Sequence, residues 1–177
     1  GVRRGYAARN VVGDAIRELG TTKADSIETF SRDEMKRVLL AIEGPAFRIK
    51  RTRALMRAMI YLAALCGMRK GEILALRWNS IDFDRGLIMV RHGIDAFDNL
   101  KGPKTAAGVR DLPMPPPVVE ALEAFRPFVV EDTRGLIFRA RTGGSMCGSD
   151  FYKLWQPVLL EADIGPSKHN EWRHFHA

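Results

Sequence analysis

The stretch on which the fold depends is AALCGMRKGEILALRW, residues 63–78. An apolar helix runs into Gly67, a residue that readily adopts the left-handed backbone conformation that ends helices. A second apolar-periodic segment begins directly afterwards, with Arg69 at its start and Glu72 three residues later. That spacing brings the two side chains within reach of each other on one helix face. Two interpretations fit the pattern: a solvated ion pair on a surface helix–turn–helix, or an arginine held in place for binding.

Composition indicates a globular protein with a basic surface. The chain has 177 residues, of which 46% are hydrophobic, enough to build the core of one ordinary domain with or without a short appendage. Its 28 Lys and Arg against 21 Asp and Glu give a net charge of +7. This excess favours a polyanionic partner, most often a nucleic acid, although many basic proteins bind none.

Three further features bear on the compartment and on membranes. The two cysteines, Cys66 and Cys147, lie far apart without metal-ligand spacing, which is typical of buried thiols in a reducing compartment. No apolar run approaches the length of a membrane span, and the first residues have no signal-peptide core. We therefore expect a cytoplasmic protein that does not enter membranes.

Helix signals dominate the first half of the chain. Ser31 and Glu34 form a capping box that predicts a helix start, and Gly44-Pro45 predicts its end. The next helix is predicted over 52–66, with one apolar face. A basic cluster precedes and enters this helix and could contact phosphates or form a solvated face: Arg48, Lys50, Arg51, Arg53 and Arg57.

A change of period after Trp78 predicts strands. Segments 81–83, 87–90 and 109–114 have strand character, the second as a buried strand after a turn at 84–86. A connection over 93–108 is too long for a tight hairpin and carries Lys101 and Lys104; it is either functional or a surface loop with solvated lysines. Further helices are predicted after Pro115 and over 151–160. The pattern as a whole predicts a mainly helical α+β fold with a small three-stranded antiparallel sheet.

The last ten residues concentrate three histidines, His169, His174 and His176, around Arg173. Their spacing does not place all three on one helix face, and no carboxylate or cysteine pattern completes a metal site. A His–Arg cluster that holds a phosphate has the better chemical motive, because guanidinium offers a fork of donors and imidazole moves protons near neutral pH. We therefore expect no metal and no cofactor.

Three segments, in order, resemble the tyrosine recombinases of the phage-integrase family. Residues 67–78 resemble the family's first arginine box, 103–113 its lysine-bearing strand connection, and 172–177 its second arginine box. The resemblance implies that residues 26–177 are a catalytic domain lacking its C-terminal part. It also implies that residues 1–25 are the tail of the preceding core-binding domain, in which 8–19 is amphipathic, plus a polar linker.

The resemblance also implies roles for individual residues. Arg69 and Arg173 would neutralise the nonbridging oxygens of a DNA phosphate as a tyrosine attacks it, leaving a 3′-phosphotyrosyl link and a free 5′-hydroxyl. Lys104 would protonate the departing 5′-oxygen, with Lys101 as the second candidate. Glu72 occupies an acidic position that would orient the site.

The chain departs from the family pattern at two points. Where the family usually has a histidine three residues before its second arginine, this chain has Asn170, with His169 one place earlier and His174 as a supporting residue. Asparagine can hydrogen-bond a phosphate but cannot transfer a proton at neutral pH. The chain also contains no match to the nucleophile, because its three tyrosines all precede Arg173: Tyr6, Tyr61 and Tyr152.

The resemblance therefore predicts a site-specific DNA recombinase or integrase. The chain is expected to be a fragment of it that lacks the nucleophile. Its partners would be double-stranded DNA and further copies of itself on DNA, with no small-molecule substrate. A noncatalytic DNA-binding module, such as a degenerate integrase remnant, is the alternative that Asn170 and the missing tyrosine favour. A third hypothesis is that the chain is a basic protein-interaction domain.

Overall fold

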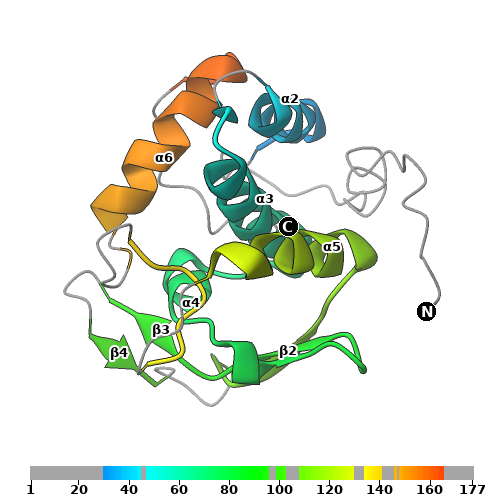
Figure 1. Ribbon diagram of the computed structural model, residues 1–177, viewed down its shortest axis with the longest axis vertical. Helices are drawn as coiled ribbons and strands as arrows, with labels where there is room; N and C mark the ends of the chain where they lie inside the picture. The colour runs from blue at the N-terminus through cyan, green and yellow to red at the C-terminus, as the bar shows by residue number, and fades with distance from the viewer. Residues whose placement is uncertain are drawn as a thin grey trace.

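The computed structural model describes residues 30–44, 47–95, 99–102, 108–129, 134–140, 146 and 148–165. The longer helices are α2 (Arg32–Glu43), α3 (Lys50–Cys66), α5 (Pro116–Phe125) and α6 (Gly148–Glu161). They gather on one side of the strands, and the short helix α4 (Lys70–Leu74) lies between the two layers (Figure 1). This arrangement confirms the predicted mainly helical α+β fold. The amphipathic segment predicted at 8–19 lies outside the described residues.

Helix α2 begins where its capping box predicts. The Glu34 backbone N–H donates to the Ser31 hydroxyl at 3.2 Å, and the Ser31 N–H donates to the Glu34 carboxylate at 2.8 Å. The helix ends at Glu43 with Gly44 as its C-cap. Phe30, just before the cap, meets the Trp155 ring of α6 edge-on, with ring centroids 6.2 Å apart. The start of α2 is thereby joined to α6, the helix against which it packs.

Helix α3 is the central element of the core. It begins two residues before the predicted position 52 and ends at Gly67, whose φ of 62° and ψ of 29° are left-handed as expected. The prediction of a single apolar face was too narrow, because every residue from Ala58 to Cys66 is buried. The reason is tertiary: α3 packs against α2 on one side and α5 on another, so its C-terminal half has no solvent-facing side.

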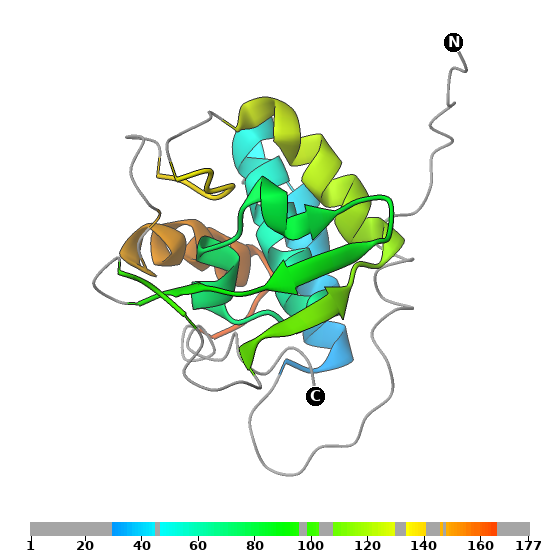
Figure 2. The same ribbon diagram turned by 90° about the horizontal axis from the view of Figure 1, so that it is seen from below.

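The main sheet has the predicted three antiparallel strands: β1 (Ile81–Asp82), β2 (Leu87–Val90) and β5 (Arg110–Pro113), in the order β1-β2-β5. Phe83, predicted to extend the first strand, falls in the turn. Strand β2 is buried on one face only, because Ile88 and Val90 are buried while Leu87 and Met89 are half-buried. The helices cover that inner face, as the view from below shows (Figure 2).

The connection over 93–108 contains a second sheet that the sequence analysis missed. Strands β3 (Gly93–Ile94) and β4 (Leu100–Lys101) pair antiparallel, with Gly93 opposite Lys101. At the end of this hairpin the Asp95 carboxylate accepts a hydrogen bond from the Asn99 backbone at 3.0 Å. Two-residue strands are too short to leave a periodic signal, so only the folded chain reveals this pairing.

The remaining elements complete the helical layer. Helix α5 starts after Pro115 and buries Val118, Leu122 and Phe125 as predicted. Helix α6 contains the predicted 151–160 and continues through Pro157. Two short 3₁₀ helices, Trp78–Ser80 and Arg126–Phe128, meet where the Arg126 guanidinium lies 5.2 Å from the Trp78 ring centroid. Within the described ranges, no helix is long and apolar enough to cross a membrane.

Candidate active site

Arg69 is the N-cap residue of α4, directly after the turn at Gly67. Its backbone N–H donates to Glu72 Oε2 at 2.8 Å, and its guanidinium Nη1 donates to Glu72 Oε1 at 3.1 Å. The Arg69 side chain is 61% exposed, whereas that of Glu72 is 11% exposed. The predicted ion pair is therefore confirmed, and it is asymmetric: the Glu72 carboxylate is mostly covered, whereas the Arg69 guanidinium faces solvent.

A second arginine, Arg110 of β5, holds the same carboxylate. Its Nη1 donates to Glu72 Oε1 at 2.9 Å and its Nη2 donates to Oε2 at 2.8 Å, a bidentate contact. Arg110 lies opposite Val90 in the sheet, and its side chain is 26% exposed. Because paired residues of adjacent strands share a face, Arg110 projects from the inner face of the sheet toward α4.

The electrostatics of this group keep Glu72 ionised. Burial alone raises the pKa of the Glu72 carboxyl, but hydrogen bonds from the Arg110 side chain and the Arg69 backbone, with the positive charge of Arg110, leave the pKa below its usual value. The hydrogen bond to Glu72 raises the pKa of Arg110, against the opposing effect of burial. At neutral pH the group therefore has two guanidinium cations and one carboxylate, an excess of positive charge whose exposed part is Arg69.

The end of β2 supports β5 at Arg110. Arg91 Nη1 donates to the Arg110 carbonyl oxygen at 2.9 Å, and Arg91 Nη2 donates to the Asp111 carboxylate at 2.5 Å. The next residue, His92, is exposed and lines, with Glu72 and Arg91, a cavity of about 10 Å³. That volume is at the lower limit for a single water molecule, so little space is left between Glu72 and the end of β2.

Helix α4 also fits closely against the second hairpin. A Cβ atom at Gly71 would lie 2.6 Å from the Ile94 carbonyl oxygen, which is closer than real Cβ contacts allow. Glycine at this position therefore lets α4 lie against β3. Helix α4, which carries Glu72 and has Arg69 as its N-cap, thus touches both sheets.

The structure places the other predicted site residues as follows. Lys101 is exposed on β4, and its ammonium lies 2.6 Å from the Asp95 carboxylate. Lys104, His169, Asn170, Arg173 and His174 lie outside the described residues. Of the predicted set, Arg69 and Glu72 are brought together here, and within the described part of the chain no group of three His, Cys, Asp or Glu could hold a metal ion.

Arg110 was missed as a site residue, although the sequence contained a signal for it. The segment 109–114 was predicted as a strand, in which alternate residues face alternate sides. Arg110 and Leu112 are the half-buried positions of β5, and Asp111 and Pro113 are exposed. A charged side chain on the inner face of a strand requires a partner, because an unpaired buried charge is costly. The alternation with Leu112 could therefore have drawn attention to Arg110.

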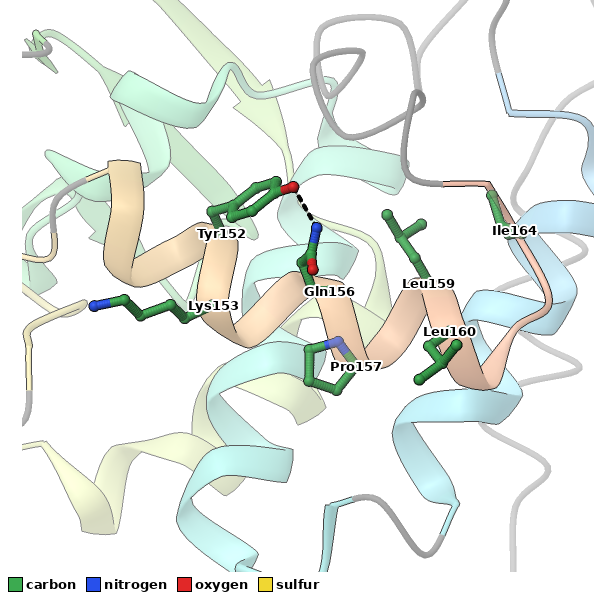
Figure 3. Close-up of a pocket in the computed structure, with 7 residues that line it drawn as sticks. All are labelled: Tyr152, Lys153, Gln156, Pro157, Leu159, Leu160 and Ile164. Carbon is green, nitrogen blue, oxygen red and sulfur yellow. Dashed lines mark hydrogen bonds between the residues drawn. The ribbon is translucent and has the colours of Figure 1, made fainter.

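A larger pocket than the cavity beside Glu72 lies elsewhere, on α6 (Figure 3). It has a volume of about 610 Å³ and shares no residue with the Arg69–Glu72–Arg110 group. The hydroxyl of Tyr152 accepts a hydrogen bond from the Gln156 amide there, and Leu160 is 83% exposed. The mainly apolar lining shows no convergent set of charged groups, so this pocket is not the candidate active site.

Comparisons with known proteins identify relatives of this chain. Residues 28–177 match the model of the phage integrase family. A tyrosine recombinase XerC-like protein of Caldanaerobacter subterraneus subsp. tengcongensis is 28% identical over 204 residues, covering 99% of this chain and 50% of that protein. Prophage integrase IntR of Escherichia coli K12 is 38% identical over 61 residues, covering 34% of this chain and 15% of that protein.

Solved structures show the same fold. The Tn1549 transposon integrase in complex with transposon right end DNA superposes with a TM-score of 0.65 at 17% identity, covering 91% of this chain and 54% of that one. The XerA recombinase superposes with a TM-score of 0.57 at 22% identity, covering 82% of this chain and 46% of that one. The chain thus spans about half the length of these two solved structures and of the XerC-like protein. With a family match over residues 28–177 and this fold, the chain belongs to the phage integrase family.

Proposed function

We propose that this chain is part of a site-specific tyrosine recombinase that breaks and rejoins double-stranded DNA. The observation that carries the proposal is the exposed Arg69 guanidinium, which is hydrogen-bonded to the mostly covered Glu72 carboxylate. In this proposal residues 26–177 belong to the catalytic domain, and residues 1–25 are the tail of a preceding domain with its linker. The protein would act in the cytoplasm, as an assembly of several copies on DNA.

The chemistry follows from the charge that develops at phosphorus. A tyrosine oxygen, from outside the residues of this chain, forms a bond to phosphorus while the bond to the 5′-oxygen breaks. The nonbridging oxygens gain negative charge in that step, and Arg69 and Arg173 neutralise it. Glu72 keeps the Arg69 head in one orientation, so little reorganisation is needed when the charge appears.

The departing 5′-oxygen needs a proton, which we assign to Lys104. Lys101 is the second candidate, and its ion pair with Asp95 supports ranking it lower, because that contact occupies its ammonium group. His169 or Asn170 fills the histidine position of the second arginine box, and His174 supports the same box. No metal or cofactor takes part in this mechanism.

The test is covalent capture on DNA. The full-length protein that contains this chain is incubated with a suicide substrate, a candidate recombination site with a nick next to the scissile phosphate, and the product is resolved on a denaturing gel. We expect a covalent protein–DNA adduct, reduced by about 100-fold or more in Arg69→Ala and Arg173→Ala, since each removes a donor to the developing charge. Arg85→Ala, an exposed arginine in the turn between β1 and β2, is the matched control and should cleave normally.

A second candidate function is supported by Asn170, which cannot transfer a proton at the position where the family has histidine. In that case the protein would occupy DNA sites without cutting them. Tight, salt-dependent binding to the cognate site with no adduct would establish this alternative and reject the recombinase proposal. Absence of salt-dependent DNA binding would reject both.

A further inference from the structure

We propose that Arg110 is a positioning residue for Arg69 and acts through Glu72. This inference rests on the proposed function, because Arg69 is the group that would contact the scissile phosphate. Arg110 would not contact the phosphate itself. Its guanidinium is committed to the Glu72 carboxylate through two hydrogen bonds of 2.9 and 2.8 Å.

Both arginines donate hydrogen bonds to both oxygens of the Glu72 carboxylate. Glu72 Oε1 accepts from both guanidiniums, and Oε2 accepts from the Arg69 backbone N–H and from Arg110. Without Arg110, the donors to Glu72 that remain among the described residues all come from Arg69, the N-cap residue of the same short helix. The carboxylate could then turn toward solvent together with the 61% exposed Arg69 side chain, and nothing in this group would fix their direction.

Arg110 provides that fixed direction because it belongs to the sheet. Its strand β5 pairs with β2 over four residues, and Arg91 of the β2 end binds its carbonyl oxygen. Helix α4 has only five residues, too few to be stable without tertiary contacts. The Arg110–Glu72 contact, between residues 38 positions apart, therefore ties the start of α4 to the sheet.

Bidentate geometry matters for this role. A guanidinium meets both carboxylate oxygens in one plane, whereas a lysine ammonium meets them as a point charge and allows rotation. Arg110→Lys should therefore be intermediate between the natural protein and Arg110→Gln. Asp84→Asn, which changes an exposed carboxylate in the turn between β1 and β2, should leave Arg69 in place and is the matched control.

The experiment compares two substrates with the full-length protein. One suicide substrate has an ordinary scissile phosphate; the other has a methylphosphonate, in which a neutral methyl group replaces one charged nonbridging oxygen. Misplacement of Arg69 matters less on the second substrate, because less charge needs neutralising. We expect Arg110→Gln to slow adduct formation by about 100-fold on the phosphate, as a shift of about 1 Å can, but by less than about 3-fold on the methylphosphonate.

The outcomes are distinct. Arg69→Ala should show the same substrate dependence as Arg110→Gln, and Asp84→Asn should match the natural protein on both substrates. An equal deficit of Arg110→Gln on the two substrates would overturn the inference, because it would indicate a general loss of folded protein. Normal cleavage of the phosphate by Arg110→Gln would overturn it as well. If the natural protein forms an adduct with neither substrate, the proposed function itself is rejected.

Discussion

Replacement of Glu72 by glutamine probes the central group of the candidate site without changing its shape. Glu72 accepts four hydrogen bonds, three from guanidinium groups and one from the Arg69 backbone. Glutamine offers one oxygen acceptor and one NH₂ donor, so two of the four contacts would set donor against donor. Hydrogen bonds to charged groups contribute about 1.5–3 kcal/mol each. Because the two losses share partners, we expect Glu72→Gln to lower the free energy of unfolding by about 3 kcal/mol at pH 7.

The pH dependence gives this prediction a second, independent check. Folding lowers the pKa of Glu72, so its contribution is fully present above the carboxyl's ordinary pKa of about 4.3. The contribution is lost as the pH falls through the lower folded value. The difference in free energy of unfolding between the natural chain and Glu72→Gln should therefore be constant at neutral pH and shrink below about pH 4.

Urea unfolding followed by circular dichroism at a series of pH values measures this difference. Glu123→Gln, an exposed carboxylate on α5, is the control and should stay within about 0.5 kcal/mol of the natural chain. The reasoning fails if Glu72→Gln lowers the free energy of unfolding at pH 7 by less than about 0.5 kcal/mol, the range expected for the control. It also fails if the destabilisation by Glu72→Gln is the same at pH 7 as below about pH 4. The charge of the carboxylate would then not be the source of the stabilisation.

Three further predictions test the packing. Gly71→Ala should destabilise the chain by about 1–3 kcal/mol because its methyl group would strike the β3 backbone, while Gly102→Ala, with no atom within 4 Å, should be neutral in the same urea titration. Trp155→Ala should cost about 3–5 kcal/mol because the ring is fully buried, whereas Leu160→Ala, at 83% exposure, should stay within about 0.5 kcal/mol; similar midpoint shifts would contradict the described core. Burial raises the pKa of the Cys66 thiol to about 12, so iodoacetamide at pH 8 should leave Cys66 unmodified in peptide mass spectra until urea unfolds the chain.

Much of the fold was predictable because its signals are local. The Ser31–Glu34 capping box and the ion pair of Arg69 with Glu72 involve residues three apart, so they follow from helix geometry alone. The end of α3 follows from Gly67, which tolerates the left-handed conformation at low cost. The three strands of the main sheet were visible in the change from a helical to a two-residue period. The roles of Lys104, Arg173, His169, Asn170 and His174 stay predictions.

The sequence by itself determined which segments become helices and strands, and it placed an arginine and a carboxylate together at the start of α4. Only the tertiary structure decided that Arg110 would meet that carboxylate, that β3 and β4 would pair, and that α3 would be buried on every side of its C-terminal half. The reason is physical. Contacts between distant residues form only after the chain has paid the entropy of bringing them together, and which of them form depends on the packing of the whole domain.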